Sequence, residues 1–352
     1  MSQHLPVIQV LLPLFAAVFC VLLKQRTVCR VITIVVAWIS LGIALSLLAT
    51  VRAEGVISYH VGGWEPPLGI ELRIDILNAY VLVIVTMIAA VVFPFGFGYW
   101  SATFPDKHEC LFFSTLLLCF CGLLGIAVTG DAFNVFVFLE VTSLSSYALI
   151  AMGPTRRSLR SAFNYLIMGT IGGTFILLAI GMVYLATGTL NMVDIADRLP
   201  AHLESRTVVV AFAFFTIGIG LKLAMFPVHQ WLPSAYANSP GIVAAFLSAT
   251  ATKVQFYLLV RVIFSIFGAA YVFGHLRFEL LLVPLSILAM FVGSTAAIFQ
   301  TNLKKMLAYS SVAQIGYMTL GLSFNNLDGL TGGLLHLFNH AMTKGGLFLV
   351  IA

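Results

Sequence analysis

Long, uninterrupted apolar stretches fill this sequence of 352 residues and limit what it can fold into. A helix rises about 1.5 Å per residue, so crossing the hydrocarbon core of a bilayer, about 30 Å thick, takes roughly 20 mainly apolar residues. The stretches are continuous, whereas the strands of a membrane β-barrel would alternate apolar and polar residues. We therefore predict an all-α polytopic membrane protein with eleven candidate spans, at 5–23, 31–51, 76–98, 110–129, 132–152, 162–186, 207–226, 241–260, 280–299, 306–324 and 330–352.

The composition excludes several other classes of protein. Hydrophobic residues make up 61% of the chain and charged residues 9%, too few charges to cover a soluble protein of this length. Basic residues form no run longer than a pair, which argues against nucleic-acid binding. The five cysteines form no CxxC pair and are expected to be small core residues. No small-residue cleavage pattern follows the first stretch, so we do not expect a cleavable signal.

The charges between the spans predict an orientation. Loops from odd to following even spans carry two acids, Asp106 and Glu109, and nine basic residues: Lys24, Arg26, Arg30, Lys107, Arg156, Arg157, Arg160, Lys304 and Lys305. The opposite side carries six arginines and ten acids. The positive-inside rule then places the first side in the cytoplasm and the N-terminus outside, in a bacterial inner membrane.

Four charged residues lie well inside predicted spans: Glu140, Lys222, Lys253 and Lys344. A charge at the centre of a membrane helix costs about 2.5 to 3.5 kcal/mol even on a lenient scale, so each needs a partner or a function. A buried carboxylate alone should stay protonated, but a nearby lysine would let both groups ionise. Glu140 therefore belongs either to a structural ion pair that fixes helix packing or to a proton-transfer site.

Lys222 lies five residues before Pro227, in TIGIGLKLAMFPVHQWLP. Proline supplies no N–H and frees the carbonyl of Leu223, so the helix should bend or break just beyond the lysine. A desolvated lysine beside a carboxylate could act as a proton switch. His229 follows after two helical turns and could face the same side if the helix resumes; the other interpretation is a satisfied polar group.

Lys253 is flanked by the small hydroxyl residues Ser248, Thr250 and Thr252, which could bond to neighbouring helices or hold water beside the amine. It lies about twelve residues into its span, too deep for snorkelling to the interface to be a good explanation.

The segment HLFNHAMTKGG contains the sharpest pattern. His336, His340 and Lys344 are spaced i, i+4, i+8, so they lie along one helix face over roughly 12 Å. Histidine suits a hydrated proton relay, because it titrates near physiological pH. The alternatives are a structural polar stripe and a metal site, although Leu337 follows His336 and the HExxH pattern is absent.

Five longer segments carry a resemblance to a known family: GDAFNVFVFLE, GIGLKLAMFPVHQWLPSAYANSP, SATATKVQFYLLVR, TNLKKMLAYSSVAQIGYM and HLFNHAMTKGGLFL. In this order they resemble the proton-translocating antiporter-like subunits shared by respiratory complex I and the multisubunit sodium/proton (Mrp) antiporters. The segment TGTLNMVDIADRL looks most like the branch formed by the D-type subunits of Mrp antiporters. The resemblance covers nearly the whole chain.

The resemblance implies roles for single residues. Glu140 matches the glutamate of the fifth helix, Lys222 the lysine of the broken seventh helix with which it pairs, and Lys253 the central lysine of the eighth. His336, His340 and Lys344 match the polar residues of the eleventh helix.

The resemblance also implies an architecture of inverted five-helix repeats. We expect an N-terminal three-helix segment at 1–109, a first repeat at 110–260 and an incomplete second repeat at 261–352. Family members continue for roughly three more helices, so the resemblance implies either a fragment or a second half-channel completed by another chain.

We therefore predict a subunit that conducts protons along a mid-membrane axis of Glu140, Lys222, Lys253, His336, His340 and Lys344, with His229 as a further candidate. The expected setting is a multisubunit monovalent cation (Na+)/H+ antiporter; the alternatives are a proton-pumping subunit of a redox complex, such as complex I or a membrane-bound hydrogenase, and a scaffold without transport. Expected partners are other membrane subunits, protons, Na+ and the lipid bilayer, with no nucleic acid. The chain has no phosphate loop, no nucleophile elbow and no cluster ligands, so we expect no cofactor and no metal.

Overall fold

The computed structural model describes residues 4–103 and 108–352. Asp106 and Lys107, which contribute to the predicted orientation, lie outside the described residues. The elements are α1 (Leu5–Leu23), α2 (Arg26–Glu54), β1 (Ile57–His60), η2 (Val61–Gly63), β2 (Glu71–Ile74), α3 (Ile76–Thr103), α4 (Glu109–Val128), α5 (Ala132–Ala151), α6 (Arg156–Thr187), α7 (Met192–Arg198), η3 (Leu199–His202), α8 (Arg206–Leu223), α9 (Trp231–Asn238), α10 (Gly241–Val260), η4 (Arg261–Phe267), η5 (Ala270–His275), α11 (Glu279–Ile298), α12 (Leu303–Ser323) and α13 (Leu327–Ile351).

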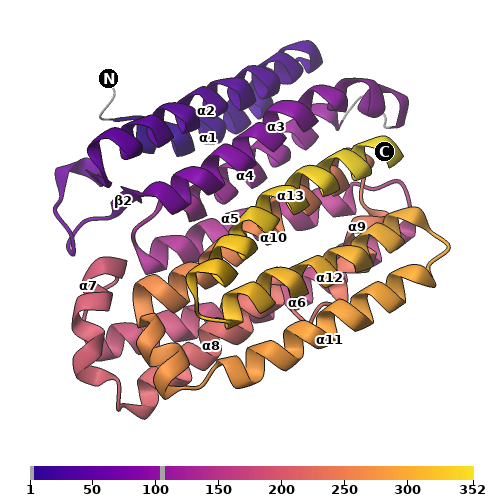
Figure 1. The fold of residues 1–352 in the computed structure, drawn as a ribbon. Helices are drawn as coiled ribbons and strands as arrows, with labels where there is room; N and C mark the ends of the chain where they lie inside the picture. The colour runs from indigo at the N-terminus through magenta and orange to yellow at the C-terminus, as the bar shows by residue number, and fades with distance from the viewer. Residues whose placement is uncertain (1–3, 104–107) are drawn as a thin grey trace.

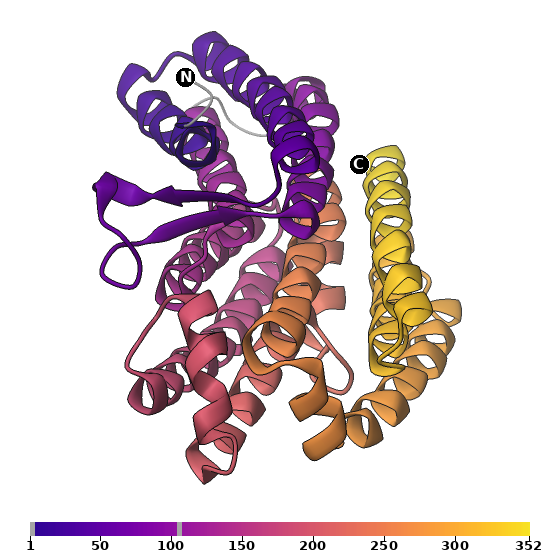
Figure 2. The ribbon, with the colours of Figure 1, turned by 60° about the vertical axis from the view of Figure 1, so that its left-hand side comes forward.

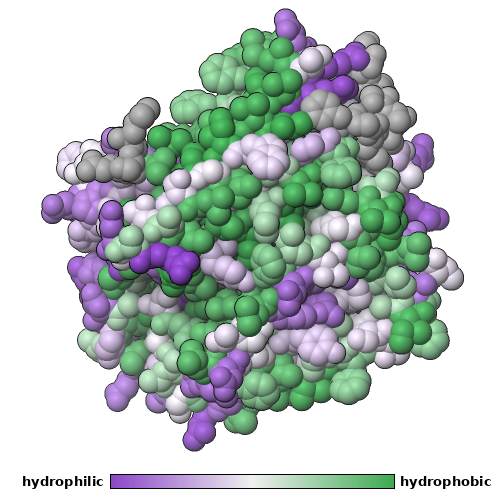
Figure 3. Space-filling view, turned by 45° about the horizontal axis from the view of Figure 1, so that its top comes forward, coloured by the Kyte–Doolittle hydropathy of each residue, from purple (hydrophilic) through white to green (hydrophobic). Residues whose placement is uncertain are grey.

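The protein is an all-helical, multi-pass membrane protein, as predicted. Within the described residues, ten helices are long and apolar enough to cross a membrane. The predicted span at 306–324 corresponds to α12, which has 21 residues but is more polar than the others. Large apolar side chains such as Phe163 and Phe291 are more than half exposed, and Figure 3 shows apolar residues over much of one face. Such a surface suits lipid.

The long helices run side by side, and α10 occupies the middle of the bundle (Figure 1). It packs against α3, α4, α8 and α13, and it is buried along nearly its whole length. The turned view shows α11 and α12 grouped beside α13, on the side of the bundle away from α1 and α2 (Figure 2). A polar side chain on α10 therefore meets protein rather than lipid. The predicted division at 109 and 260 stays a prediction.

Glycines allow two of these helices to approach closely. A Cβ on Gly172 of α6 would lie 3.0 Å from the carbonyl oxygen of Gly218 on α8, and a Cβ on Gly218 would lie 2.7 Å from that of Gly172. The next glycine, Gly173, faces α5, where a Cβ would collide with the carboxylate of Glu140. The glycines of GTIGGTF thus serve helix packing beside an ionisable group.

The predicted break beyond Lys222 is confirmed. Helix α8 ends at Leu223, and Ala224 adopts a left-handed conformation with φ 61°. Helical structure resumes as α9 at Trp231, whose indole N–H donates to the carbonyl of Leu221 at 2.9 Å. The same carbonyl also accepts the backbone N–H of Ala224 at 3.3 Å, so the indole adds a second donor at the end of α8.

One end of the bundle carries a small hairpin that the sequence did not predict. Strands β1 and β2 pair antiparallel, with Ile57 opposite Ile74. Glu71 of β2 accepts bonds from Ser58 at 2.5 Å and from Asn191, beside α7, at 2.7 Å. Burial of Glu71 opposes ionisation, but the bonds from Ser58 and Asn191 and the charge of Arg73 outweigh it and hold its pKa below the ordinary value. The carboxylate therefore ties the hairpin to the segment before α7.

Candidate functional site

The structure brings Glu140 of α5 and Lys222 of α8 together. The Lys222 amine lies 3.4 Å from Glu140 Oε1 and donates to the hydroxyl of Ser143 at 2.5 Å. The lysine side chain is almost fully buried, whereas that of Glu140 is 26% exposed. Glu140 and Ser143 are three residues apart and so share one face of α5. Lys222, at the end of the broken helix, therefore has one charged and one neutral partner.

Lys253 has no such acid among the described residues within ion-pair distance. Its amine is fully buried, donates to the carbonyl of Ser248 and lies 3.4 Å from the hydroxyl of Thr252. The hydroxyls of Ser248 and Thr250 bond to carbonyls within α10 rather than to a neighbouring helix. A buried ammonium held only by neutral oxygens is costly, so this site favours a lysine whose proton can leave.

The stripe on α13 lies on one face, as its spacing predicts. The rings of His336 and His340 stack with centroids 6.2 Å apart. The Lys344 amine donates to the carbonyl of Leu307 at 2.8 Å and to the hydroxyl of Ser310, both on α12. Helices α10 and α13 pack against each other, so Lys253 lies on the helix next to the stripe.

A cavity of about 260 Å3 borders this stripe, with Gln314, Asn339 and Thr343 among its lining residues. Both ring nitrogens of His340 and Nε2 of His336 are buried without a hydrogen-bond partner in the described part of the chain. A buried polar atom without a partner is costly, and a polar cavity of this size has room for several water molecules. The site therefore suits a hydrated relay.

The other two interpretations of the stripe find less support. Over residues 4–103 and 108–352, no three side chains of histidine, cysteine, aspartate or glutamate lie close enough together to hold a metal ion. Structural zinc sites use four such ligands. A purely structural stripe would be expected to satisfy its polar atoms, and the imidazole nitrogens are not satisfied here.

His229 lies apart from this pattern. The helix does not resume before Trp231, so the two-turn spacing from Lys222 to His229 does not apply. The imidazole is buried in the connecting loop and stacks on Phe226, with ring centroids 5.4 Å apart. Its Nδ1 is buried without a partner among the described residues.

Aromatic residues that the sequence analysis missed lie between the two parts of the axis. Tyr165 stacks on Trp231 at a centroid distance of 4.0 Å and meets Tyr147 edge to face at 4.7 Å. Tyr236 lies on α9, the helix that begins at Trp231. Tyr236 in turn donates to the carbonyl of Leu247, one residue before the carbonyl that holds Lys253. The only sequence feature that could have pointed to these aromatic residues is the position of Tyr147, four residues after Ser143.

These features define a class of protein: antiporter-like, proton-translocating membrane subunits, in which a broken helix and a line of buried charges cross the middle of a helical bundle. The chain belongs to the NADH:quinone oxidoreductase/Mrp antiporter transmembrane family, which matches residues 129–352.

Relatives come from two kinds of complex. The N-type subunit of the NADH-quinone oxidoreductase of Desulforudis audaxviator is 41% identical over 355 residues, covering 99% of this chain and 70% of the relative. The D-type subunit of the Na(+)/H(+) antiporter of Alkalihalophilus pseudofirmus is 28% identical over 348 residues, covering 99% and 69%.

Similar solved structures also come from a respiratory complex and from an Mrp complex. A chain of the archaeal membrane-bound sulfane sulfur reductase superposes with a TM-score of 0.89 at 29% identity, covering 99% of this chain and 70% of that one. A chain of the Mrp complex from Dietzia sp. DQ12-45-1b also gives 0.89, at 27% identity, covering 99% and 64%. Both are subunits of multisubunit membrane complexes.

Proposed function

We propose that this chain conducts protons across the bundle along Glu140, Lys222, Lys253, His336, His340 and Lys344. The observation that carries the proposal is the placement of the Lys222 amine between a carboxylate and a hydroxyl at the end of a broken helix. A lysine with both a charged and a neutral acceptor has two states of different charge that can both be stabilised.

The proposed transfer uses repulsion between buried charges. While Glu140 is ionised, it stabilises an ammonium at Lys222. When that attraction weakens, the proton passes toward Lys253 through the tyrosine hydroxyls between the two lysines, such as that of Tyr236. The stacked rings of Tyr165 and Trp231 line this route but carry no proton. Helices α10 and α13 pack against each other, and like charges on Lys253 and Lys344 repel, so a proton that arrives at one favours release from the other. The hydrated cavity beside His336 and His340 accepts it.

The proposed setting is a multisubunit monovalent cation (Na+)/H+ antiporter. Support comes from the Mrp complex, which matches 99% of this chain with a TM-score of 0.89, and from the relative in the Alkalihalophilus antiporter. A second candidate is a redox-driven proton pump, favoured by the 41% identity to the NADH-quinone oxidoreductase relative. Electron carriers would then be held by partner chains.

One experiment separates the two settings. The complex is purified through a tag on this chain, its subunits are identified by mass spectrometry, and proton movement is measured in vesicles. An antiporter exchanges protons against an imposed Na+ gradient without an electron donor, and its subunits lack flavin and iron–sulfur proteins. A redox pump needs the donor. Proton movement under neither condition would contradict the proposal.

A further inference from the structure

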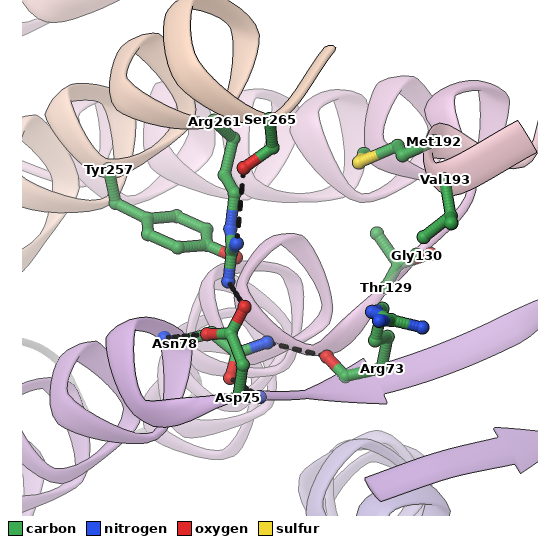
Figure 4. Close-up of a pocket in the computed structure, with 10 residues that line it drawn as sticks. All are labelled: Arg73, Asp75, Asn78, Thr129, Gly130, Met192, Val193, Tyr257, Arg261 and Ser265. Carbon is green, nitrogen blue, oxygen red and sulfur yellow. Dashed lines mark hydrogen bonds and ion pairs between the residues drawn. The ribbon is translucent and has the colours of Figure 1, made fainter. Parts of the chain in front are cut away.

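A second polar region lies at the end of the bundle that carries the hairpin and α7. A pocket of about 240 Å3, the end pocket, is lined by residues of β2, α3, α7, α10 and η4, and of the turn between α4 and α5 (Figure 4). They are Arg73, Asp75, Asn78, Thr129, Gly130, Met192, Val193, Tyr257, Arg261 and Ser265. A polar pocket of this volume has room for several water molecules.

An ion pair spans the end pocket. Arg261 of η4 and Asp75, just before α3, point toward each other in Figure 4, with Nη2 and Oδ2 2.5 Å apart. The second oxygen of Asp75 accepts the backbone N–H groups of Leu77 and Asn78, at 2.9 and 3.1 Å, which fixes the carboxylate to the start of α3. The pair therefore joins α3 to the end of α10.

The arginine is also related to the central lysine by its position along the chain. Lys253 and Tyr257 of α10 and Arg261, the first residue of η4, are spaced i, i+4, i+8, so they form a stripe over roughly 12 Å of one face. Arg261 Nε donates to the Tyr257 hydroxyl at 3.0 Å, and that hydroxyl donates to the carbonyl of Ala127 at 3.1 Å. The end pocket thus reaches Tyr257, which follows Lys253 by one helical turn, whereas the Lys253 amine points the other way along the helix, to the carbonyl of Ser248.

The backbone changes at the same place. From Arg261 to Phe267 the helix adopts the wider π-helical winding, directly after Val260. Insertions of π winding in helices occur frequently at functional sites, because they turn side chains out of the regular helical register. Here the change begins at the arginine that forms the ion pair.

We propose that the end pocket is an aqueous vestibule and that the Arg261–Asp75 pair, together with Tyr257, forms the gate between this vestibule and Lys253. The inference rests on the proposed function, because it assumes that Lys253 carries a proton. The vestibule gives the proton-transfer axis a connection to water beside the end of α10. This connection is separate from the cavity beside His336 and His340. With the pair closed, Arg261 and Tyr257 cover the route to the lysine.

The test measures passive proton leak in proteoliposomes that contain the assembled complex, after a pH step without a gradient of the coupled ion. Asp75→Asn keeps the acceptor for the backbone of α3 but loses the charge, and Arg261→Gln removes the other half of the pair. Each should raise the leak several-fold, and adding Lys253→Met should return it to the original level. The matched control is Arg198→Gln, which breaks the Arg198–Asp194 pair on neighbouring α7 and should leave the leak unchanged.

Three results would overturn the gate: an unchanged leak in both assembled variants, an equal leak in Arg198→Gln, or a leak that persists with Lys253→Met. Failure of both variants to assemble would assign the pair a structural role and also overturn it. The proposed function fails separately, if Lys253→Met alone keeps ion-coupled transport at the original rate. Lost transport in Lys253→Met with no leak in the pair variants would overturn the gate alone.

Discussion

Replacing Glu140 by glutamine keeps the shape of the side chain and removes its charge from beside Lys222. At the observed 3.4 Å, two unit charges attract by about 5 kcal/mol at an effective dielectric constant of about 20. The carboxylate is partly exposed and the bond from the amine to Ser143 survives, so we expect a net cost of about 3 kcal/mol. This corresponds to roughly a hundredfold change in an equilibrium constant, because about 1.4 kcal/mol is tenfold.

The assay follows ion-coupled proton transport in vesicles that contain the assembled complex, with the amount of this chain measured by immunoblot. The initial rate for Glu140→Gln should fall by about a hundredfold, to near the background of empty vesicles. Glu140→Asp keeps the charge on a shorter side chain and should retain part of the rate. The two variants separate the effect of charge from the effect of geometry.

The matched control is Glu109→Gln. Glu109 is buried at the start of α4 and forms an ion pair with Arg30, away from the proposed axis. Its loss can lower the amount of assembled protein, but the rate per assembled molecule should stay near the original. Our reasoning is refuted if Glu140→Gln transports at the original rate, or if Glu109→Gln loses the same fraction per assembled molecule.

Three further predictions concern other parts of the chain. Lys222→Ala should abolish coupled transport while the protein still assembles, and Lys222→Arg should not restore it, because a guanidinium does not release its proton at these pH values; full rates in either variant would exclude the lysine from transport. For the stripe on α13, single alanine substitutions of His336, His340 and Lys344 should each slow transport, and a strong chelator should have no effect; chelator sensitivity together with an active Lys344→Ala would indicate a metal site instead. The depressed pKa of Glu71 means that its contribution to stability is complete above the ordinary glutamate pKa of about 4.3 and is lost as pH falls through the lower folded-state value. Thermal unfolding measured across acidic pH should show this loss, and a Glu71→Gln variant with the same pH dependence would disprove it.

The sequence predicted the spans well because each apolar stretch must be about as long as the bilayer is thick, whatever lies beside it. The break after Lys222 was also predictable, because a proline such as Pro227 interrupts the helix in which it would lie, whatever packs beside that helix. Strands β1 and β2 escaped prediction because each has only four residues, and their pairing depends on contacts with the segment before α7. Short strands carry too little periodicity to be recognised.

The sequence predicted which residues belong to the candidate site, but it did not predict which other residues they contact. A lysine inside an apolar stretch is visible in any sequence, so Lys344 was found. Its partners on α12, the Leu307 carbonyl and Ser310, are not visible, because a carbonyl has no sequence signature and serine is common in helices. The Arg261–Asp75 pair was missed for a related reason: both residues lie near span ends, where a charge needs no explanation.

The burial of α10 has a consequence for how the chain is made. As the ribosome extends the protein, α3, α4 and α8 emerge before α10 and can pack against it, but α13 emerges only later. Until then, the face of α10 that meets α13 has no protein cover, and a charged amine at mid-helix costs about 2.5 to 3.5 kcal/mol in lipid. We therefore expect the nascent chain to keep α10 at the insertion machinery until α13 arrives, so that the two helices enter the bilayer together.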